Sequence, residues 1–351
     1  MAKAKKLSSG NWRVLQYAGL DSNGKRIYNS FTAPTKEEAE QNALDFKYYG
    51  LTHKSDERME ACLTFDEAVD QYINSKCNIL SPSTVRGYRI AQKNAFDMIK
   101  NVPLPQIDEL LLQRWANNNA LHYKSKSIRN QFGLITAVFR QNKRFLDFKS
   151  ILLKPKEKPE YNIPDEQDMA AIFKVIEGKK IEIPVLLALM LGLRQSEIAA
   201  LCWADYRDND IHIHAAHVPN ENHKLVRKER AKSFAGNRVI PDIPQYLKEK
   251  LDAADKTDKY ISPYRYPSSV LRAFKRELEK EGLPLYKMHE LRHANASVML
   301  LKGIPDKYAM ERLGQSTTYM LKNVYQHTFK SEQTKIAKQV NDSFSEILKK
   351  K

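Results

Sequence analysis

A proline-rich, charged segment interrupts the sequence near its middle and limits how the chain can fold. Residues Leu152–Asp168 read LLKPKEKPEYNIPDEQD and show no apolar periodicity. Such a segment cannot join a packed core, because its prolines interrupt helices and sheets and its charges stay in water. A chain of 351 residues is also long enough for more than one core. We therefore expect a linker at 152–165, with separately folded regions on either side.

Residues 1–58 are expected to form a three-stranded sheet with one helix. Residues 10–32 alternate in strand fashion around the turn Asp21–Gly24, and Thr35 with Glu38 has the spacing of a helix-capping box. Aromatic and basic residues are interleaved on the strands, where they either face a polyanion or form the small core. For Trp12 we favour the core. The interleaved residues are Trp12, Arg13, Tyr17, Lys25, Arg26 and Tyr28.

Residues 59–151 are predicted to form an all-α domain. Apolar residues recur there at intervals of three and four. Thr64 with Glu67, Ser81 before Pro82, and Ser127 are helix-start signals. Basic and polar residues gather in STVRGYRIAQKNAF and HYKSKSIRNQ, which predicts one basic face. The expected helices are 65–76, 82–99, 107–117 and 127–142.

Residues 166–351 are predicted to form a mixed, mainly α domain with a small antiparallel β-sheet. Helical periodicity continues to about Leu201, DIHIHAAHV and NRVIPDI alternate as strands, and helical periodicity then returns. The apolar run Ile183–Leu193 is too short to span a bilayer, so it is expected to be a buried helix and not a membrane segment.

Charge and cysteine usage narrow the class of protein. The formal net charge is +16 and the isoelectric point is near 9.5, which suits binding to nucleic acid but is shared by some ordinary soluble proteins. Cys62, Cys77 and Cys202 are an odd, widely spaced set, which indicates neither a disulfide framework nor a cysteine-zinc site. No apolar segment follows the basic N-terminus, so no signal peptide is indicated and a reducing cytosol fits best.

The segment Met288–Ser297, MHELRHANAS, fits two motifs with different chemistry. One is H-E-x-x-H, in which His289 and His293 hold zinc and Glu290 acts as the base of a metalloprotease. The other is H-x-x-R, in which His289 and Arg292 share a helix face and grip a phosphate without a metal. The segment alone does not separate the two.

Three other residues of this region are ordinary when taken singly. Arg194 follows the apolar run in LMLGLRQSEIAAL, ahead of Ser196 as the expected N-cap, and an arginine there is usually a salt-bridge partner. Lys232, in RAKSFAGNRVIP, lies between two predicted strands at a glycine-bearing turn and would normally be solvated. Tyr325, in KNVYQHTF, would normally be assigned to packing.

Taken together and in order, these segments resemble the catalytic domain of tyrosine recombinases, above all the integrases of temperate phages and conjugative transposons. The segments LGLRQSEI, AKSFAGNRVIP, HELRH and RLGQSTTYMLKNVYQH carry the resemblance between Arg194 and His327. The two upstream domains resemble the arm-site-binding and core-site-binding domains of the same integrases. The resemblance thus implies a site-specific DNA recombinase that integrates and excises a mobile element.

The resemblance also implies a role for each residue. Tyr325 would attack the phosphate and leave the DNA 3′ phosphate on the enzyme, so that rejoining needs neither ATP nor a metal. Arg194 and Arg292 would clamp the phosphate oxygens. Lys232 would protonate the leaving 5′ oxygen and His289 would assist at the nucleophile. Glu197 maps to an acidic supporting residue of the family.

The sequence departs from the family pattern in two places. Gln315 stands where the family usually has a histidine or a tryptophan, although an amide can still donate to a phosphate oxygen. The spacing from Gln315 to Tyr325 is one residue longer than is common, and Tyr319 lies between them as a rival nucleophile. We favour Tyr325 because VYQH matches the Y-x-H ending of the family and TTYM does not.

The resemblance further implies the partners. Double-stranded DNA with core-type and arm-type sites is the expected substrate, bound by a homotetramer on paired sites in the bacterial cytosol, at the nucleoid. DNA-bending accessory proteins and an excision factor are expected to assist. The last segment is predicted to be an amphipathic helix that either packs in its own core or docks on a neighbouring subunit. Its apolar residues are Ile336, Val340, Phe344 and Ile347.

Three alternatives remain beside the recombinase. In a zinc metalloprotease, Glu311 would be the third zinc ligand. This interpretation gives no role to Arg194, Lys232 and Tyr325, and the positive charge of Arg292 would repel Zn²⁺. A type IB topoisomerase needs nearly the same residues and would relax supercoils as a monomer. A DNA-binding regulator without chemistry would lack at least one of the set, and only the Gln315 position is altered.

Overall fold

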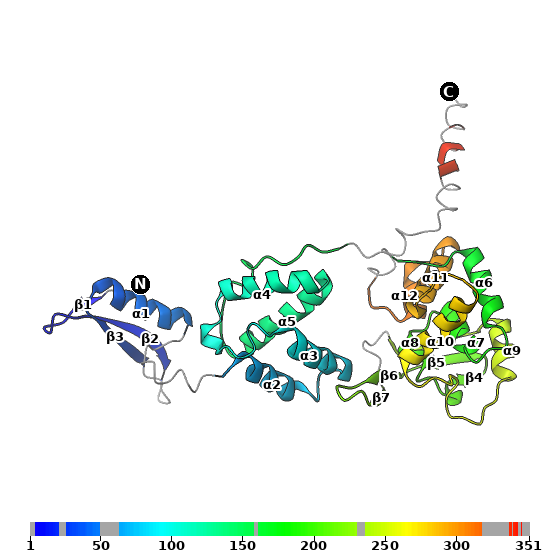
Figure 1. Ribbon diagram of the computed structural model, residues 1–351, viewed down its shortest axis with the longest axis horizontal. Helices are drawn as coiled ribbons and strands as arrows, with labels where there is room; N and C mark the ends of the chain where they lie inside the picture. Colours follow the sequence, from blue (N-terminus) through cyan, green and yellow to red (C-terminus); the bar gives the residue numbers. More distant parts are fainter. Residues whose placement is uncertain are drawn as a thin grey trace. The chain divides into compact units, whose positions relative to one another are not determined.

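The computed structural model describes residues 4–20, 26–49, 63–157, 161–229 and 236–317, and also 337, 338, 340–342 and 345 (Figure 1). The chain divides into two compact units, residues 1–80 with 87–157 and residues 81–86 with 158–351. The expected fold class is confirmed, because a small sheet with one helix, a set of helices and a mixed, mainly α region follow in this order. The domain boundaries stay predictions. Among the described helices, none has the length and apolar content needed to cross a bilayer.

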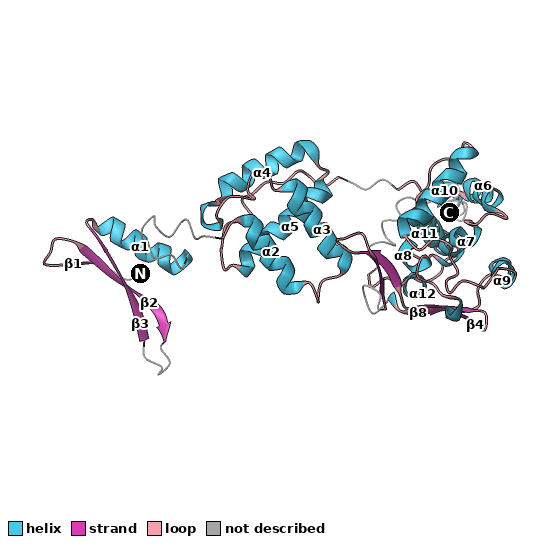
Figure 2. Cartoon of the chain, turned by 60° about the horizontal axis from the view of Figure 1, so that its bottom comes forward, coloured by secondary structure: helices cyan, strands magenta, loops and turns pink. Residues whose placement is uncertain are grey.

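The first elements form a small sheet with one covered face. Strands β1 (Lys5–Lys6), β2 (Trp12–Leu20) and β3 (Arg26–Ala33) are antiparallel in the order β1-β2-β3, and helix α1 (Lys36–Tyr49) packs against β2 and β3 (Figure 1, Figure 2). Trp12 packs against the apolar core between sheet and helix, so its assignment to the core is confirmed. The core residues are Val14, Phe31, Ala33, Ala39 and Ala43. The turn Asp21–Gly24 lies outside the described residues.

The helical region that follows, residues 65–141, is stabilised by contacts between aromatic side chains. Phe65 and Phe96 meet edge to face at 5.1 Å between ring centroids, and Trp115 lies 6.0 Å from Phe96. Such pairs add about 0.5–1.5 kcal/mol each beyond the burial of their area. The elements are α2 (Phe65–Lys76), α3 (Pro82–Ala95), the 3-10 helix η2 (Leu104–Gln106), α4 (Glu109–His122) and α5 (Ser125–Gln141).

The helix starts show which capping predictions hold. Thr64 and Glu67 form the predicted capping box of α2, and the Ser81 hydroxyl accepts the N–H of Thr84 at the start of α3. The prediction for Ser127 is wrong, because α5 begins at Ser125 after Lys124, whose side chain makes no cap. The second helix also ends at Ala95, earlier than predicted.

The C-terminal unit contains two small sheets in addition to its helices. The strand order is β4-β5-β8 in one sheet and β6-β7 in the other, and all pairs are antiparallel. Its elements are α6 (Glu166–Ile176), α7 (Glu182–Leu191), α8 (Gln195–Ile198), η3 (Trp203–Asp205), β4 (Tyr206–Arg207), β5 (Asp210–Ile213), β6 (Ala216–Pro219), β7 (Leu225–Lys228), β8 (Arg238–Ile240), α9 (Gln245–Asp252), α10 (Pro267–Lys280), α11 (Met288–Leu301) and α12 (Asp306–Leu313).

The apolar run predicted to be a buried helix is α7, and it lies in the centre of this unit. Val185, Leu186 and Leu187 are fully buried, and α7 packs against α11 and α9. At roughly 1.5–3 kcal/mol for each fully buried aliphatic side chain, this helix contributes strongly to the stability of the unit. Its C-terminus is therefore a rigid platform for the residues that follow.

Candidate active site

Two helix C-termini define the site. Helix α7 ends at Gly192 and helix α12 ends at Gly314, both in the left-handed conformation, with φ of 68° and 62°. The last carbonyl groups of a helix have no partner within it and carry partial negative charge. Here they face arginines: Arg292 on α11 donates to the carbonyl oxygens of Gly192 and Leu313, and Arg194 donates to that of Gly314 at 2.6 Å. The two guanidinium groups are thus held by backbone.

Arg292 is a buried cation. Its side chain is 1% exposed, and burial lowers its pKa to about 9, with repulsion by Arg194 acting in the same direction and Glu197 opposing it. It donates to two carbonyl oxygens, which are neutral. A desolvated guanidinium in this setting gains more from an incoming anion than an exposed one does.

Arg194 is oriented by Glu197. The Arg194 Nη1 donates to Glu197 Oε1 at 2.6 Å, and the Arg194 backbone N–H donates to Glu197 Oε2 at 2.8 Å. Arg194 itself is the N-cap residue of α8, with φ −74° and ψ 147°. The predicted cap at Ser196 is therefore wrong, because the Glu197 carboxylate satisfies the first free N–H of the helix.

Arg238, at the start of β8, is a member of the cluster that the sequence did not indicate. It forms a two-point ion pair with Glu197, with Nη1 at 3.2 Å from Oε1 and Nη2 at 3.1 Å from Oε2. Burial of the Glu197 carboxyl raises its pKa, but Arg238 and then Arg194 outweigh burial and leave the pKa below its usual value. Glu197 is thus an anion between two guanidinium groups.

The cluster carries more positive than negative charge. Arg312, at the end of α12, lies close enough for Arg238 to lower its pKa, after a larger effect of burial. Three guanidinium groups, those of Arg194, Arg238 and Arg292, thus interact with the Glu197 carboxylate, and that of Arg312 interacts with Arg238. A concentration of this kind is complementary to a phosphate group.

The H-E-x-x-H residues lie at the start of α11 and have separate surroundings. His289 is exposed, whereas His293 is 2% exposed, and their rings are 4.6 Å apart. Burial, then the neighbouring His289 and Arg292, lowers the pKa of His293 to about 3. The Glu290 carboxylate accepts the Lys287 N–H at 2.7 Å and so caps the helix. Within the described ranges, no three histidine, cysteine or acidic side chains gather as a metal-ligand set.

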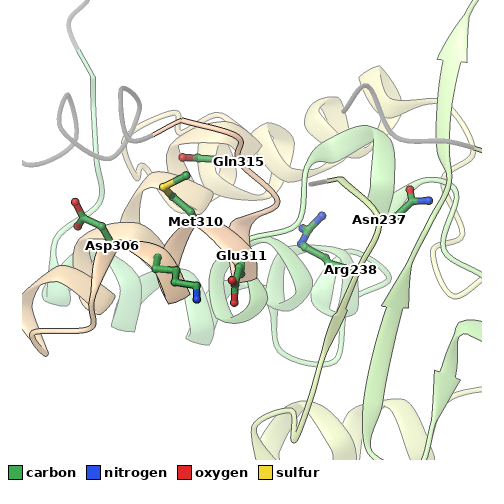
Figure 3. Close-up of a pocket in the computed structure, with 7 residues that line it drawn as sticks. Asn237, Arg238, Asp306, Met310, Glu311 and Gln315 are labelled. Atoms are coloured by element: carbon green, nitrogen blue, oxygen red, sulfur yellow. The ribbon is translucent and has the colours of Figure 1, made fainter. Parts of the chain in front are cut away.

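Gln315 lies beside the cluster and, like Arg238, lines a pocket of about 410 Å³ (Figure 3). Its backbone N–H donates to the Met310 carbonyl at 2.9 Å and closes the end of α12. Its side-chain Oε1 is buried and has no hydrogen-bond partner within the described part of the chain. The pocket is lined by Asn237, Arg238, Asp306, Lys307, Met310, Glu311 and Gln315.

The structure thus brings Arg194, Glu197 and Arg292 together, with Gln315 next to them and His289 one helical turn before Arg292 on α11. Lys232, Tyr319 and Tyr325 lie outside the described residues, so their places in the site stay predictions. The added member is Arg238. Its only sequence signal is its position at the start of the strand NRVIP, which a surface arginine shares.

Comparison with known sequences places the site in a family. Residues 164–332 match the model of the phage integrase family. The chain is 23% identical to a tyrosine recombinase XerC-like protein of Caldanaerobacter subterraneus, covering 95% of this chain and 96% of that protein. It is 29% identical to a putative prophage phiRv2 integrase of Mycobacterium tuberculosis over 44% of each chain.

Solved structures agree on the fold. A Tn1549 transposon integrase in complex with transposon right end DNA superposes with a TM-score of 0.60 at 18% identity, over 80% of this chain and 100% of that one. A lambda integrase tetramer bound to a Holliday junction superposes with a TM-score of 0.57 at 17% identity, over 92% and 94%. At these identities the likeness establishes a shared multidomain architecture.

Proposed function

We propose that this chain, a member of the phage integrase family, uses Tyr325 to integrate and excise a mobile element. It is a DNA-cleaving and rejoining enzyme of the tyrosine recombinase type. The relatives named above include a transposon integrase and a prophage integrase, which supports this kind of DNA substrate. The finer assignments rest on the geometry of the arginine cluster.

The proposed reaction is a transesterification at a DNA phosphate. The phenolic oxygen of Tyr325 attacks phosphorus, the bond to the 5′ oxygen breaks, and the 3′ phosphate stays on the tyrosine. The leaving 5′ oxygen takes its proton from Lys232, and His289 assists proton transfer at the nucleophile. A 5′ hydroxyl of another strand then reverses the reaction, and because one phosphodiester replaces another, neither ATP nor a metal is needed.

One observation carries this proposal: Arg194 and Arg292 are held by carbonyl groups at the ends of α7 and α12. Each guanidinium terminal nitrogen has two N–H groups, and each of these bonds to a backbone carbonyl uses one of them. In the proposed complex the remaining donors bind two phosphate oxygens. Such preorganised donors lower the barrier because they need no reorganisation when negative charge develops, and removing one costs about 100- to 1,000-fold in rate.

The sheet β1-β2-β3 offers a surface for the proposed arm-type DNA site. On the face away from α1, Tyr17 and Tyr28 are a cross-strand pair with ring centroids 5.9 Å apart, and each is about half exposed. Arg13 is exposed on the same strand, two pleats before Tyr17. Aromatic and basic side chains on one open face suit contacts with sugars and phosphates. The core-type site is assigned to the basic face of the helices between 63 and 151.

A homotetramer on two paired sites is the proposed working form, assisted by DNA-bending proteins and an excision factor, in the bacterial cytosol at the nucleoid. The lambda integrase that shares this fold is a tetramer on a Holliday junction, which supports the assembly. Val340, in the predicted C-terminal helix, is 48% exposed, as a residue that docks on a neighbouring subunit would be before assembly.

A nicked suicide DNA substrate carrying the end of the element tests the function. The wild-type enzyme is expected to form a covalent protein–DNA adduct, because the nick releases the short strand and prevents rejoining. Tyr325→Phe should form none, while Tyr319→Phe should form it at the wild-type rate. An adduct that survives Tyr325→Phe but not Tyr319→Phe would move the nucleophile to Tyr319. Absence of any wild-type adduct on its own end sequence, with DNA bound, would refute the proposed reaction.

A further inference from the structure

Arg238 differs from the two proposed phosphate-binding arginines in how its donors are used. Its Nε donates to the Arg312 carbonyl at 2.7 Å, its Nη1 to Glu197 Oε1 and to the Gly236 carbonyl at 3.2 Å each, and its Nη2 to Glu197 Oε2 at 3.1 Å. Protein acceptors thus engage four of the five N–H donors of Arg238, against two each for Arg194 and Arg292, so it is poorly placed to bind a substrate phosphate.

We propose that Arg238 is a positioning residue for DNA cleavage, which keeps Glu197 ionised and aimed at Arg194 and joins β8 to the end of α12. This inference rests on the proposed function, because it assigns Arg194 to the scissile phosphate. Arg238 acts through Glu197 and does not touch the DNA.

The charges around Glu197 explain why a second cation is needed. Glu197 is 4% exposed, and a buried carboxylate is costly unless it is paired on both oxygens. It faces Arg194 ahead of α8, Arg238 of β8 and Arg292 of α11, and the Arg312 side chain of α12 interacts with Arg238. Without Arg238, burial would favour the neutral acid. A neutral Glu197 offers Arg194 only a weaker bond, and the guanidinium is then free to leave its orientation.

The second consequence concerns the chain that carries Lys232. Arg238 is the first residue of β8 and lies six positions after Lys232, a reach of at most about 20 Å when extended. The bond from Arg238 to the Arg312 carbonyl ties this end of the β7–β8 connection to α12, whose C-terminus holds the donors of Arg194 and Arg292. Arg238 thus ties the connection that bears the proposed general acid to the structure that holds the proposed phosphate clamp.

Four variants of the full chain separate positioning from simple stabilisation. Arg238→Met removes both the charge and the guanidinium group that donates to both oxygens of Glu197, and Arg238→Lys keeps the charge without this two-point contact. Glu197→Gln removes the carboxylate and is made alone and in combination with Arg238→Met. The matched control is Arg207→Met on β4 of the same sheet, an exposed arginine that donates a hydrogen bond to the Ala204 carbonyl. Each is measured for core-site DNA affinity, thermal unfolding, and the pH dependence of single-turnover adduct formation. The protonation of Glu197 is followed without DNA by infrared spectroscopy of ¹³C-carboxyl-labelled glutamate, assigned with Glu197→Gln.

The expected result for Arg238→Met is adduct formation slower by about 100-fold, comparable to loss of a preorganised donor, with DNA affinity within about threefold of wild type. As the pH is lowered, its rate of adduct formation should begin to fall at a higher pH than the wild-type rate, in step with protonation of Glu197. Arg238→Lys should move this fall in rate back towards the wild-type pH while the enzyme remains slow. Glu197→Gln should show no such fall in rate. Arg207→Met should match wild type.

Two outcomes would overturn the proposal. One is a Glu197 carboxyl that titrates alike in wild type and in Arg238→Met. The other is a slow Arg238→Met whose pH profile is unchanged and whose loss follows its unfolding temperature, because that is stabilisation alone. The infrared measurement does not require catalysis. If the protein formed no adduct at all, the proposed function would be refuted, and the infrared measurement would still show whether Arg238 keeps Glu197 ionised.

Discussion

Arg194 and Gly314 are 120 residues apart in sequence, and the Arg194 guanidinium donates a hydrogen bond of 2.6 Å to the Gly314 carbonyl oxygen. Gly314 ends α12, and the next residue, Gln315, begins the segment that leads to Tyr325. The contact therefore fixes the start of the segment that carries the proposed nucleophile to the proposed phosphate clamp. The orientation of the Arg194 guanidinium and the position of Gly314, just before this segment, thus depend on the same hydrogen bond.

Replacement of Gly192 by alanine should damage both stability and the site. Gly192 has φ +68°, and an added Cβ would lie 2.5 Å from Leu313 Cδ2 and 2.9 Å from Asn295 Oδ1. The backbone strain costs about 1–2 kcal/mol, and repacking of this core contact costs about 1–3 kcal/mol more. Because the Gly192 carbonyl anchors Arg292, adduct formation should fall further than stability alone explains.

Gly178→Ala is the matched control for this effect. Gly178 has φ +70°, but an added Cβ there meets nothing within 4 Å. Urea unfolding of this variant should show the backbone strain alone, about 1–2 kcal/mol, with adduct formation unchanged. Equal losses of stability in the two variants would contradict the proposed clash with Leu313 and Asn295.

The buried His293 should make the native state weaken as the pH falls. Its folded pKa of about 3 lies below its ordinary value of 6.5, so between these values the unfolded chain binds a proton that the native protein does not. The stability that depends on a neutral His293 is therefore fully present above pH 6.5 and is lost as the pH falls towards 3, at about 1.4 kcal/mol per pH unit. Replacing His293 with phenylalanine keeps a ring against Tyr161, whose centroid is 4.9 Å away, and removes this dependence.

The check is urea unfolding of wild type and His293→Phe at pH 7 and pH 5. Between pH 7 and pH 5, the free energy of unfolding of wild type should fall by about 2 kcal/mol more than that of the variant. This is the loss of about 1.4 kcal/mol per pH unit taken from pH 6.5 down to pH 5. The same loss in both proteins would show that His293 takes up a proton in the native state as easily as in the unfolded chain.

How far the sequence predicts this structure depends on whether the decisive signal is local. The capping box of Thr64 and the apolar run of α7 are local, and both are found as predicted. Strand β7 was missed because LVRK is half-buried at every position, so it has no alternation of exposed and buried residues. DIHIHAAHV was predicted to be one strand, but it breaks after Ile213 into β5 and β6, which lie in different sheets.

The same distinction holds within the site. Arg194 and Arg292 were predictable because each stands in a recognisable short motif, whereas their contacts with the carbonyl oxygens of Gly314, Gly192 and Leu313 depend on how α7, α11 and α12 meet. Arg238 could not be found in this way. An arginine that opens a short strand has the same sequence signal whether it is solvated or, as here, buried against a carboxylate.

Truncation after Phe329 should spare DNA binding and impair strand exchange. The segment beyond it carries the predicted amphipathic helix, and exposed Val340 is free to dock on a second copy of the chain. Gel-shift affinity for one core site should stay within about threefold of wild type, because the proposed phosphate and base contacts come from residues before Phe329. Recombination between two sites should be lost. Recombination at the wild-type rate would show that the C-terminal helix packs within its own subunit.

Gln315 is expected to serve the phosphate as a hydrogen-bond donor, and an isosteric substitution tests this directly. Gln315→Glu replaces the amide nitrogen by a charged oxygen without changing the size of the side chain, so it should repel the phosphate and slow adduct formation by about 100-fold or more. Gln315→His, which restores a residue type that this family usually has, should keep a donor and stay within about tenfold of wild type.

Glu311→Gln provides the opposite charge change in the same pocket. If only the local charge mattered, its removal of a negative charge would speed cleavage as strongly as Gln315→Glu slows it. We expect almost no effect from Glu311→Gln, because the role of Gln315 depends on a directed hydrogen bond, whose strength falls steeply with distance and angle. A rate for Gln315→Glu equal to wild type, with folding intact, would remove Gln315 from the site and leave the phosphate to Arg194 and Arg292 alone.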